Sequence, residues 1–187
     1  KTYCKKPVIP FSEVKKKFPP NKYNMHVALS YKKLNLLRQE KYFQAKHCGY
    51  NLINYISSKS TFWPDLAIGD NCFVLENQNL QPNIKLGNNI MLWSGNHIGH
   101  GTIISDHTYI SSHVVVSGNC FIGKRCFLGV NSTIKDFIKI EDDSFVGMGA
   151  NVTRNLKEGS VVVNSSSTIL EKHDRKAKVI KKKYFGL

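Results

Sequence analysis

The sequence predicts a mainly β protein whose chain winds into a parallel β-helix, and two periodic features carry this prediction. A branched aliphatic residue recurs every six residues from Ile68 to Val152 without interruption. Small or apolar residues also recur four positions after these aliphatics. A six-residue unit cannot bury an apolar face alone, so such units must coil and stack into a common core. With three units in each turn, a coil takes about 18 residues.

Three series of residues follow from this period. The aliphatic series, which we expect to form the core, is Ile68, Val74, Leu80, Leu86, Leu92, Ile98, Ile104, Ile110, Val116, Ile122, Leu128, Ile134, Ile140, Val146 and Val152. The residue directly after each aliphatic is often small, as a tight corner requires. The small residues at this position are Gly69, Gly87, Gly99, Ser105, Ser111, Ser117, Gly123, Gly129 and Gly147. The series four positions after the aliphatics should also point inward and includes Cys72, Ile84, Ile90, Thr102, Thr108, Val114, Cys120, Cys126, Ser132 and Ala150.

The chain before the repeats has the pattern of a βαβ fragment. Residues 26–30 are expected to form a buried strand, residues 33–46 a helix closed by Gly49, and residues 52–56 a second strand. The organisation predicted is an α/β segment over residues 1–60, the β-helix over 61–167 and a basic tail over 168–187. A charged tail of this kind is ordinarily a solvated terminal helix or a disordered end.

The composition favours anionic partners and a reducing compartment. The chain of 187 residues carries 27 basic and 13 acidic side chains, for a net charge of +14. This surplus fits phosphate-rich ligands, nucleic acid or anionic membranes. Five scattered cysteines form no CxxC pair, so neither a disulfide framework nor a zinc cluster is indicated. No run of residues is apolar enough for a membrane span or a signal peptide, and we expect a soluble cytoplasmic protein.

Four stretches within the repeats resemble the sugar O-acyltransferase family, which includes sialic acid O-acetyltransferases and N-acetyltransferases of nucleotide-linked amino sugars. They are residues 92–100, 105–110, 117–119 and 126–131. The resemblance implies a left-handed β-helix, preceded by a Rossmann-like half that holds the substrate. It also implies a homotrimer that binds acetyl-CoA between neighbouring β-helices and acetylates a nucleotide-linked sugar for glycan biosynthesis.

The chain departs from this family in two respects. Family members usually open with a strand and a glycine-rich turn that help to hold the nucleotide-sugar, whereas this sequence begins after that point, as a truncated chain would. The relatives often carry an acidic residue directly after the catalytic histidine, where this chain has Gly101. The substrate and the partner of the histidine are therefore both left open.

Acyl transfer from a thioester requires a base for the attacking amine or hydroxyl, and the resemblance places that base at His100. An ordinary imidazole is largely neutral at pH 7 and can act without a strong carboxylate partner. Asp106, one repeat further on, is a candidate orienting carboxylate, and the alternative is that it caps the corner before His107. His97 is a second candidate base, while His107 and His113 are expected to be surface histidines.

The remaining site residues follow from the resemblance alone. The positions that match the family's acetyl-CoA groove are Tyr109, Gly118, Val130 and Met148. Gly118 could let a thioester approach the backbone or could simply form a corner. The relatives carry a different polar side chain at the position of Tyr109. Asn96 and His97 are expected to contact the substrate, and no metal is expected.

Three other functions compete with this prediction. A γ-type carbonic anhydrase shares the β-helix, but its zinc-binding histidines lie five positions apart, a spacing absent from His97, His100, His107 and His113. A nucleic-acid-binding module would use the positive charge, yet the basic residues avoid the repeats. The third is a catalytically impaired protein that binds a sugar-nucleotide or has a structural role.

Overall fold

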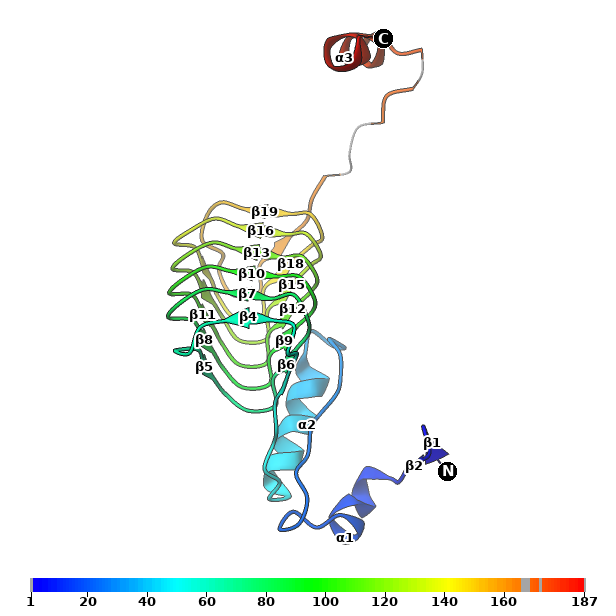
Figure 1. Ribbon diagram of the computed structural model, residues 1–187, viewed down its shortest axis with the longest axis vertical. Helices are drawn as coiled ribbons and strands as arrows, with labels where there is room; N and C mark the ends of the chain where they lie inside the picture. Colours follow the sequence, from blue (N-terminus) through cyan, green and yellow to red (C-terminus); the bar gives the residue numbers. More distant parts are fainter. Residues whose placement is uncertain (1, 166–168, 172, 187) are drawn as a thin grey trace.

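A computed structural model describes residues 2–165, 169–171 and 173–186. Its centre is a three-sided parallel β-solenoid made of two-residue strands (Figure 1). The first side is a seven-stranded sheet, which we call the aromatic face. Its strands are β3 (Tyr55–Ile56), β6 (Phe73–Val74), β9 (Met91–Leu92), β12 (Tyr109–Ile110), β15 (Phe127–Leu128), β18 (Phe145–Val146) and β20 (Val161–Val162).

The other two sides are more polar. The six-stranded polar face contains β4 (Thr61–Phe62), β7 (Asn79–Leu80), β10 (His97–Ile98), β13 (Val115–Val116), β16 (Thr133–Ile134) and β19 (Asn151–Val152). The third side is also parallel, and we call it the mixed face because its outward residues are both apolar and charged. Its five strands are β5 (Ala67–Ile68), β8 (Lys85–Leu86), β11 (Ile103–Ile104), β14 (Phe121–Ile122) and β17 (Lys139–Ile140).

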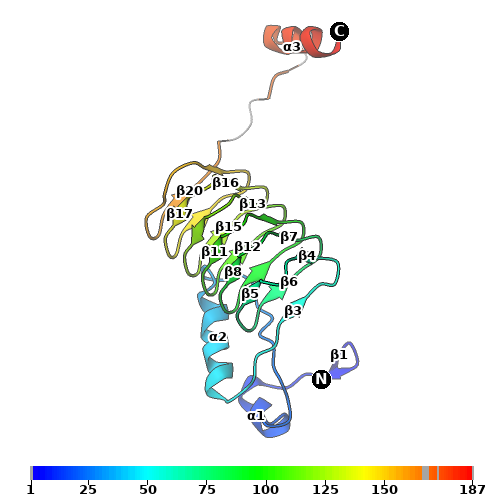
Figure 2. The ribbon, with the colours of Figure 1, turned by 60° about the vertical axis from the view of Figure 1, so that its left-hand side comes forward.

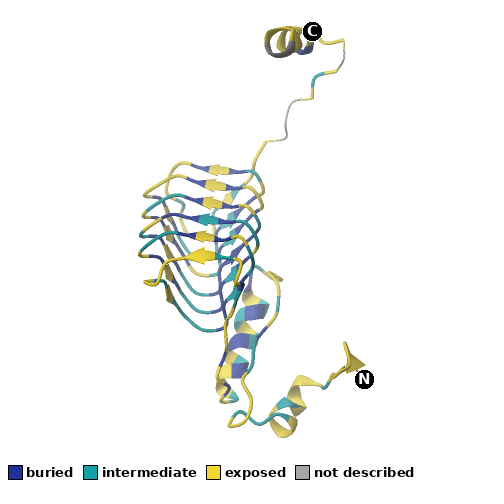
Figure 3. Ribbon diagram, in the orientation of Figure 1, coloured by how far each residue is buried: buried dark blue, intermediate teal, exposed yellow. Residues whose placement is uncertain are grey.

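The predicted period is confirmed in both register and burial. His97 pairs with Asn79 on one side and Val115 on the other, so neighbouring coils are 18 residues apart. All aliphatics of the six-residue series from Val74 to Val152 are buried, and Ile68 is half-buried. Every residue named in the series four positions after the aliphatics is also buried. Figure 3 shows buried and exposed positions alternating along each coil. The left hand of the coil, which the resemblance implies, stays a prediction.

A further six-residue series, which the sequence analysis missed, shapes the corners. It lies three positions after each aliphatic from Ile68 to Val146, and each member has a positive φ. The members are Asn71, Asn77, Asn83, Asn89, Gly95, Gly101, His107, His113, Asn119, Arg125, Asn131, Phe137, Asp143 and Gly149. Asparagine and glycine dominate because they tolerate the left-handed conformation best. Each of these corners between consecutive sides of the prism therefore contains one residue in the left-handed backbone conformation.

The structure corrects the predicted βαβ fragment. Residues 26–30 do not form a strand. The two predicted strand regions are joined by a single isolated parallel β-bridge between Met25 and Leu52. The helix is α2 (Leu36–His47), which starts late because Lys33, Leu34 and Asn35 all have positive φ. β3 belongs to the solenoid, so residues 55–60 extend it below the predicted boundary at residue 61. A Rossmann-like sheet is not formed by residues 2–60.

Helix α2 docks on the solenoid through two buried polar side chains. Asn35 donates from Nδ2 to the carbonyls of Arg125 and Cys126, each over 3.0 Å. Arg38 donates to the carbonyl of His107 over 2.6 Å and to Asn35 Oδ1 over 3.0 Å. The carbonyls of Arg125 and His107 accept no backbone hydrogen bond from the described coils, so Asn35 and Arg38 satisfy groups that would otherwise be left to water. The helix therefore covers one edge of the prism, as Figure 2 shows.

Short elements lie at the two ends of the chain. The N-terminal part contains an antiparallel pair, β1 (Thr2–Tyr3) and β2 (Lys6–Pro7), then η1 (Phe11–Glu13) and α1 (Val14–Lys17). The C-terminal part contains α3 (Arg175–Phe185), which ends at Gly186 in the left-handed conformation. α3 lies beyond the last coil, at the end of the solenoid opposite α1 (Figures 1 and 2). No described helix is long and apolar enough to cross a membrane.

Candidate active site

Each edge of the prism carries one of the histidines in the repeats, and we name the edges accordingly. The His100 edge joins the polar face to the mixed face and includes residues 99–102 and 117–120. The His107 edge joins the mixed face to the aromatic face and includes residues 105–108. The His113 edge joins the aromatic face to the polar face and includes residues 93–96, 111–114, 129–132 and 147–150.

His100 is exposed, and the neighbouring coils orient its imidazole. Gln81 Oε1 lies 2.9 Å from the backbone nitrogen of His100 and 3.2 Å from its Nδ1. Asn119 Nδ2 lies 3.4 Å from Nε2 on the other side. Neither contact was predicted, although both partners are 19 residues from His100, which is one coil and one position. An imidazole held between an acceptor at Nδ1 and a donor at Nε2 has its basic nitrogen at Nε2.

Gly118 lies directly beneath the His100 ring. A Cβ at this glycine would be 2.7 Å from His100 Cε1 and 2.9 Å from Nε2. Real Cβ atoms do not approach other heavy atoms this closely, so the absence of a side chain makes room for the imidazole. The structure thus separates Gly118 from the other three residues expected to bind the cofactor and places it with the candidate base.

The structure does not bring Asp106 to His100. Asp106 lies on the His107 edge, where its Oδ1 accepts a 2.7 Å hydrogen bond from the backbone nitrogen of Asn88. A carboxylate that bonds a backbone N–H one coil away caps a corner, which is the alternative that the sequence left open. The hydrogen bonds that the structure gives the His100 ring come from the amide side chains of Gln81 and Asn119.

Tyr109, Val130 and Met148 come together in a groove beside Tyr31. This aromatic groove, of about 760 Å³, runs from the aromatic face onto the His113 edge. It is lined by Ser30, Tyr31, Trp93, Tyr109, Ser111, Ser112, Phe127, Gly129, Val130, Phe145 and Met148. Grooves with mostly apolar walls and a few hydroxyl groups are typical of small-molecule sites. Three of the four predicted cofactor residues therefore share one cavity.

Tyr109 forms the floor of this groove and is buried. Its ring stacks on Phe127 with centroids 5.3 Å apart, and Tyr31 packs edge-on against it at 5.0 Å. Burial raises the pKa of the Tyr109 phenol, while a hydrogen bond with Ser30 opposes this shift. The phenol therefore stays protonated at neutral pH.

The two residues expected to contact substrate differ in accessibility. Asn96 is 1% exposed, and its Oδ1 accepts a 2.8 Å bond from the Val114 nitrogen. Its Nδ2 donates to the Trp93 carbonyl, so the Asn96 amide is used inside the solenoid. This contradicts the expected substrate contact. His97 is half-buried on the outer side of β10, next to the His100 edge.

His107 is not the surface histidine that the sequence analysis expected. It is 3% exposed, and burial lowers its pKa to about 4. Asn89 Nδ2 lies 2.9 Å from its Nδ1, and the rings of Tyr42 and Phe43 pack against it. His107 therefore stays neutral and belongs to the packing of the fold. Within the described part of the chain, no three His, Cys, Asp or Glu side chains gather as metal ligands would.

Comparisons with known proteins agree with this architecture. Residues 120–154 match the family described as hexapeptide repeat of succinyl-transferase. No curated protein sequence matches the chain. Among solved structures, the acetyltransferase domain of PglB from Neisseria gonorrhoeae, in complex with acetyl coenzyme A, is similar with a TM-score of 0.78 and 19% identity. This similarity covers 86% of this chain and 77% of that one.

Two further structures are similar over much of the chain. WeeI from Acinetobacter baumannii has a TM-score of 0.74 and 20% identity, covering 91% of this chain and 81% of that one. A mutant of perosamine N-acetyltransferase from Caulobacter crescentus, in complex with CoA and GDP-perosamine, has a TM-score of 0.67 and 23% identity. The match covers 68% of this chain but only 60% of that protein. The chain therefore carries hexapeptide repeats over residues 120–154 and shares the fold of these solved structures.

Proposed function

We propose that the protein transfers an acetyl group from acetyl-CoA to the amino group, or a hydroxyl group, of a nucleotide-linked sugar. The observation that carries this proposal is the exposed His100 imidazole, oriented by Gln81 and seated over Gly118. The similar solved proteins include a perosamine N-acetyltransferase with CoA and GDP-perosamine, which supports the reaction class. The acceptor sugar follows from the resemblance and is part of the proposal.

In the proposed reaction His100 is the general base. Gln81 Oε1 can only accept, so it holds the imidazole proton on Nδ1 and leaves the Nε2 lone pair free to act. As the sugar nitrogen attacks the thioester carbonyl, Nε2 takes its proton, and the C–S bond then breaks. The imidazolium returns the proton to the departing thiolate. The long 3.4 Å contact from Asn119 is one that the incoming amine would replace.

A homotrimer would complete the site. His100 and the aromatic groove lie on different edges of one solenoid, at opposite sides of the polar face. A groove that holds acetyl-CoA would therefore serve the His100 edge of a neighbouring copy. The apolar wall formed by Val130 and Met148 suits the pantetheine arm, and Ser111 and Ser112 offer hydroxyl groups to its amides.

The direct test is release of free thiol from acetyl-CoA in the presence of nucleotide-linked amino sugars. We expect thiol release that depends on the sugar, together with a sugar product heavier by one acetyl group. Absence of thiol release with every amino and hydroxyl acceptor tested would contradict the proposal.

A catalytically impaired binding protein is the second candidate, and one observation favours it. No carboxylate contacts His100 among the described residues, because Gly101 follows it and Asp106 lies on another edge. Such a protein would be stabilised thermally by CoA and by a nucleotide-sugar without releasing thiol. Turnover above the uncatalysed rate would dismiss it.

The cytoplasm is the proposed compartment. All five cysteines lie among the described residues and are free thiols, three of them buried in the solenoid core. Free thiols are typical of proteins that work in a reducing environment.

A further inference from the structure

The positive charge of the chain is concentrated outside the solenoid. Residues 61–165 contain seven basic and nine acidic side chains, so the solenoid itself is slightly acidic. Helix α3 contains six basic residues and no acidic residue within its 11 positions. The phosphate groups of the proposed substrates would bind at the solenoid, so they do not account for this cluster.

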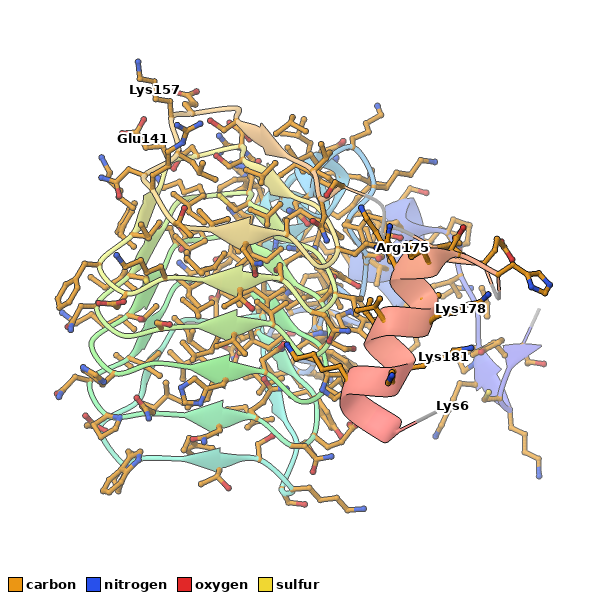
Figure 4. All side chains as sticks on the ribbon, turned by 90° about the horizontal axis from the view of Figure 1, so that it is seen from above. Lys6, Glu141, Lys157, Arg175, Lys178 and Lys181 are labelled. Atoms are coloured by element: carbon orange, nitrogen blue, oxygen red, sulfur yellow. The ribbon has the colours of Figure 1, made fainter. Side chains whose placement is uncertain are left out.

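The cations of α3 are held apart from the acidic solenoid. α3 lies beyond the last coil, and Figure 4 shows Arg175, Lys178 and Lys181 along successive turns of the helix. None of the ion pairs among the described residues involves these three side chains. These three side chains therefore present positive charge that no ion pair in the described part of the chain offsets.

Aliphatic side chains are exposed on the same helix. Val179 is 59% exposed and Ile180 is 45% exposed, on a helix in which six of the 11 residues are basic. Ile169, a short distance before the helix, is 83% exposed. Exposed aliphatics next to clustered lysines are typical of helices that lie in a membrane interface, where the lysines meet anionic headgroups and the aliphatics enter the acyl boundary.

We propose that α3 binds the surface of an anionic phospholipid membrane. The charge complementarity is with phosphate headgroups, and Val179 and Ile180 supply an apolar contact that nucleic acid would not require. The helix is too short to span a bilayer and would lie in the plane of the headgroups. Each lysine near such a surface contributes about a fivefold gain in binding. This proposal does not depend on the acetyltransferase activity.

The test is flotation of the full chain with phosphatidylcholine vesicles, with and without phosphatidylglycerol. We expect binding only to the vesicles that contain phosphatidylglycerol, weakened by salt because exposed charges are screened. The triple variant Lys178→Gln, Lys181→Gln and Lys182→Gln should bind roughly 100-fold more weakly. The matched control is Lys15→Gln, Lys16→Gln and Lys17→Gln in α1, which removes the same charge elsewhere and should bind as the wild type does.

A further variant separates a membrane from other anionic partners. Ile180→Ser keeps every charge, and its loss of apolar contact should weaken vesicle binding several-fold. Equal weakening by the α1 and α3 triple variants would overturn the proposal, because binding would then depend on net charge alone. So would binding to pure phosphatidylcholine, or unchanged vesicle binding by Ile180→Ser together with tight binding of a DNA duplex. Unaltered thermal unfolding of each variant shows that the solenoid is intact.

Discussion

The His100 edge and the His107 edge carry the same type of side chain, seven residues apart, in opposite environments. His100 is exposed, and its two ring nitrogens lie beside amide side chains of neighbouring coils. His107 is buried under α2, in the left-handed conformation, and burial lowers its pKa to about 4. Helix α2 covers one edge and leaves the other open. The comparison shows that the element packed on an edge decides whether a histidine there is buried in the fold or stays open to solvent.

The largest difference between the two edges should be in catalysis. We expect His100→Ala to lower the turnover number by about 10²–10⁴, because the base is lost. His107→Asn should leave turnover unchanged, since Asn89 occupies the same corner position in the preceding coil. Steady-state thiol release from both variants measures this. Wild-type turnover in His100→Ala would remove His100 from the mechanism.

The next largest effect should be on the stability of the covered edge. Arg38→Met removes the donors to the carbonyls of His107 and Thr108. We expect the free energy of unfolding to fall by roughly 2–4 kcal/mol, because buried hydrogen bonds to a charged group are lost. Glu40→Met, on the exposed side of α2, should change it by less than about 0.5 kcal/mol. Equal effects in chemical denaturation would show that Arg38 does not hold the helix on the solenoid.

A smaller effect is expected from crowding the His100 ring. Gly118→Ala places a Cβ where the imidazole lies and should displace it, lowering turnover by roughly 10–100-fold. In a His100→Ala background the same change should leave the free energy of unfolding unaltered, since the obstacle is gone. If Gly118→Ala destabilised both backgrounds equally, the strain would come from the backbone rather than from the ring.

The last prediction concerns pH and applies only below about pH 6.5. The folded-state pKa of His107, about 4, lies below its unfolded value of about 6.5. Between these values the unfolded chain takes up a proton that the folded chain does not. The free energy of unfolding should therefore fall as pH falls from about 6.5 to 4, and this contribution should be constant above that window. Denaturation curves of wild type and His107→Asn should diverge only there, and identical pH profiles would contradict the assignment.

The fold was predictable where a short-range pattern determines it. The aliphatic period predicted the coil length and the core, because burial of one residue in six leaves the solenoid few alternatives. The start of α2 was not predictable in this way. Its N-terminus is fixed by three positive-φ residues, Lys33, Leu34 and Asn35, and by the bonds of Asn35 to the solenoid. Those are tertiary effects that override the apolar pattern of the helix.

The candidate site was predictable only in part. The resemblance identified His100 and the three residues that share the aromatic groove. The six-residue spacing suggested Asp106 as a partner, although a residue six positions on lies at the next edge of the prism. Neighbours of His100 are found one coil away, at Gly118, or one coil and one position away, at Gln81 and Asn119. Sequence reasoning that follows the chain cannot find these contacts, because they join different coils.

The central claim is that a complete site takes the His100 edge from one copy and the aromatic groove from another. It is tested most directly by mixing two inactive variants, His100→Ala and Val130→Trp, the second of which fills the groove. If the copies exchange freely, about a quarter of the interfaces should combine an intact edge with an intact groove and recover activity in that proportion. A mixture that stays as inactive as its two parents, after exchange has been demonstrated, would contradict the claim.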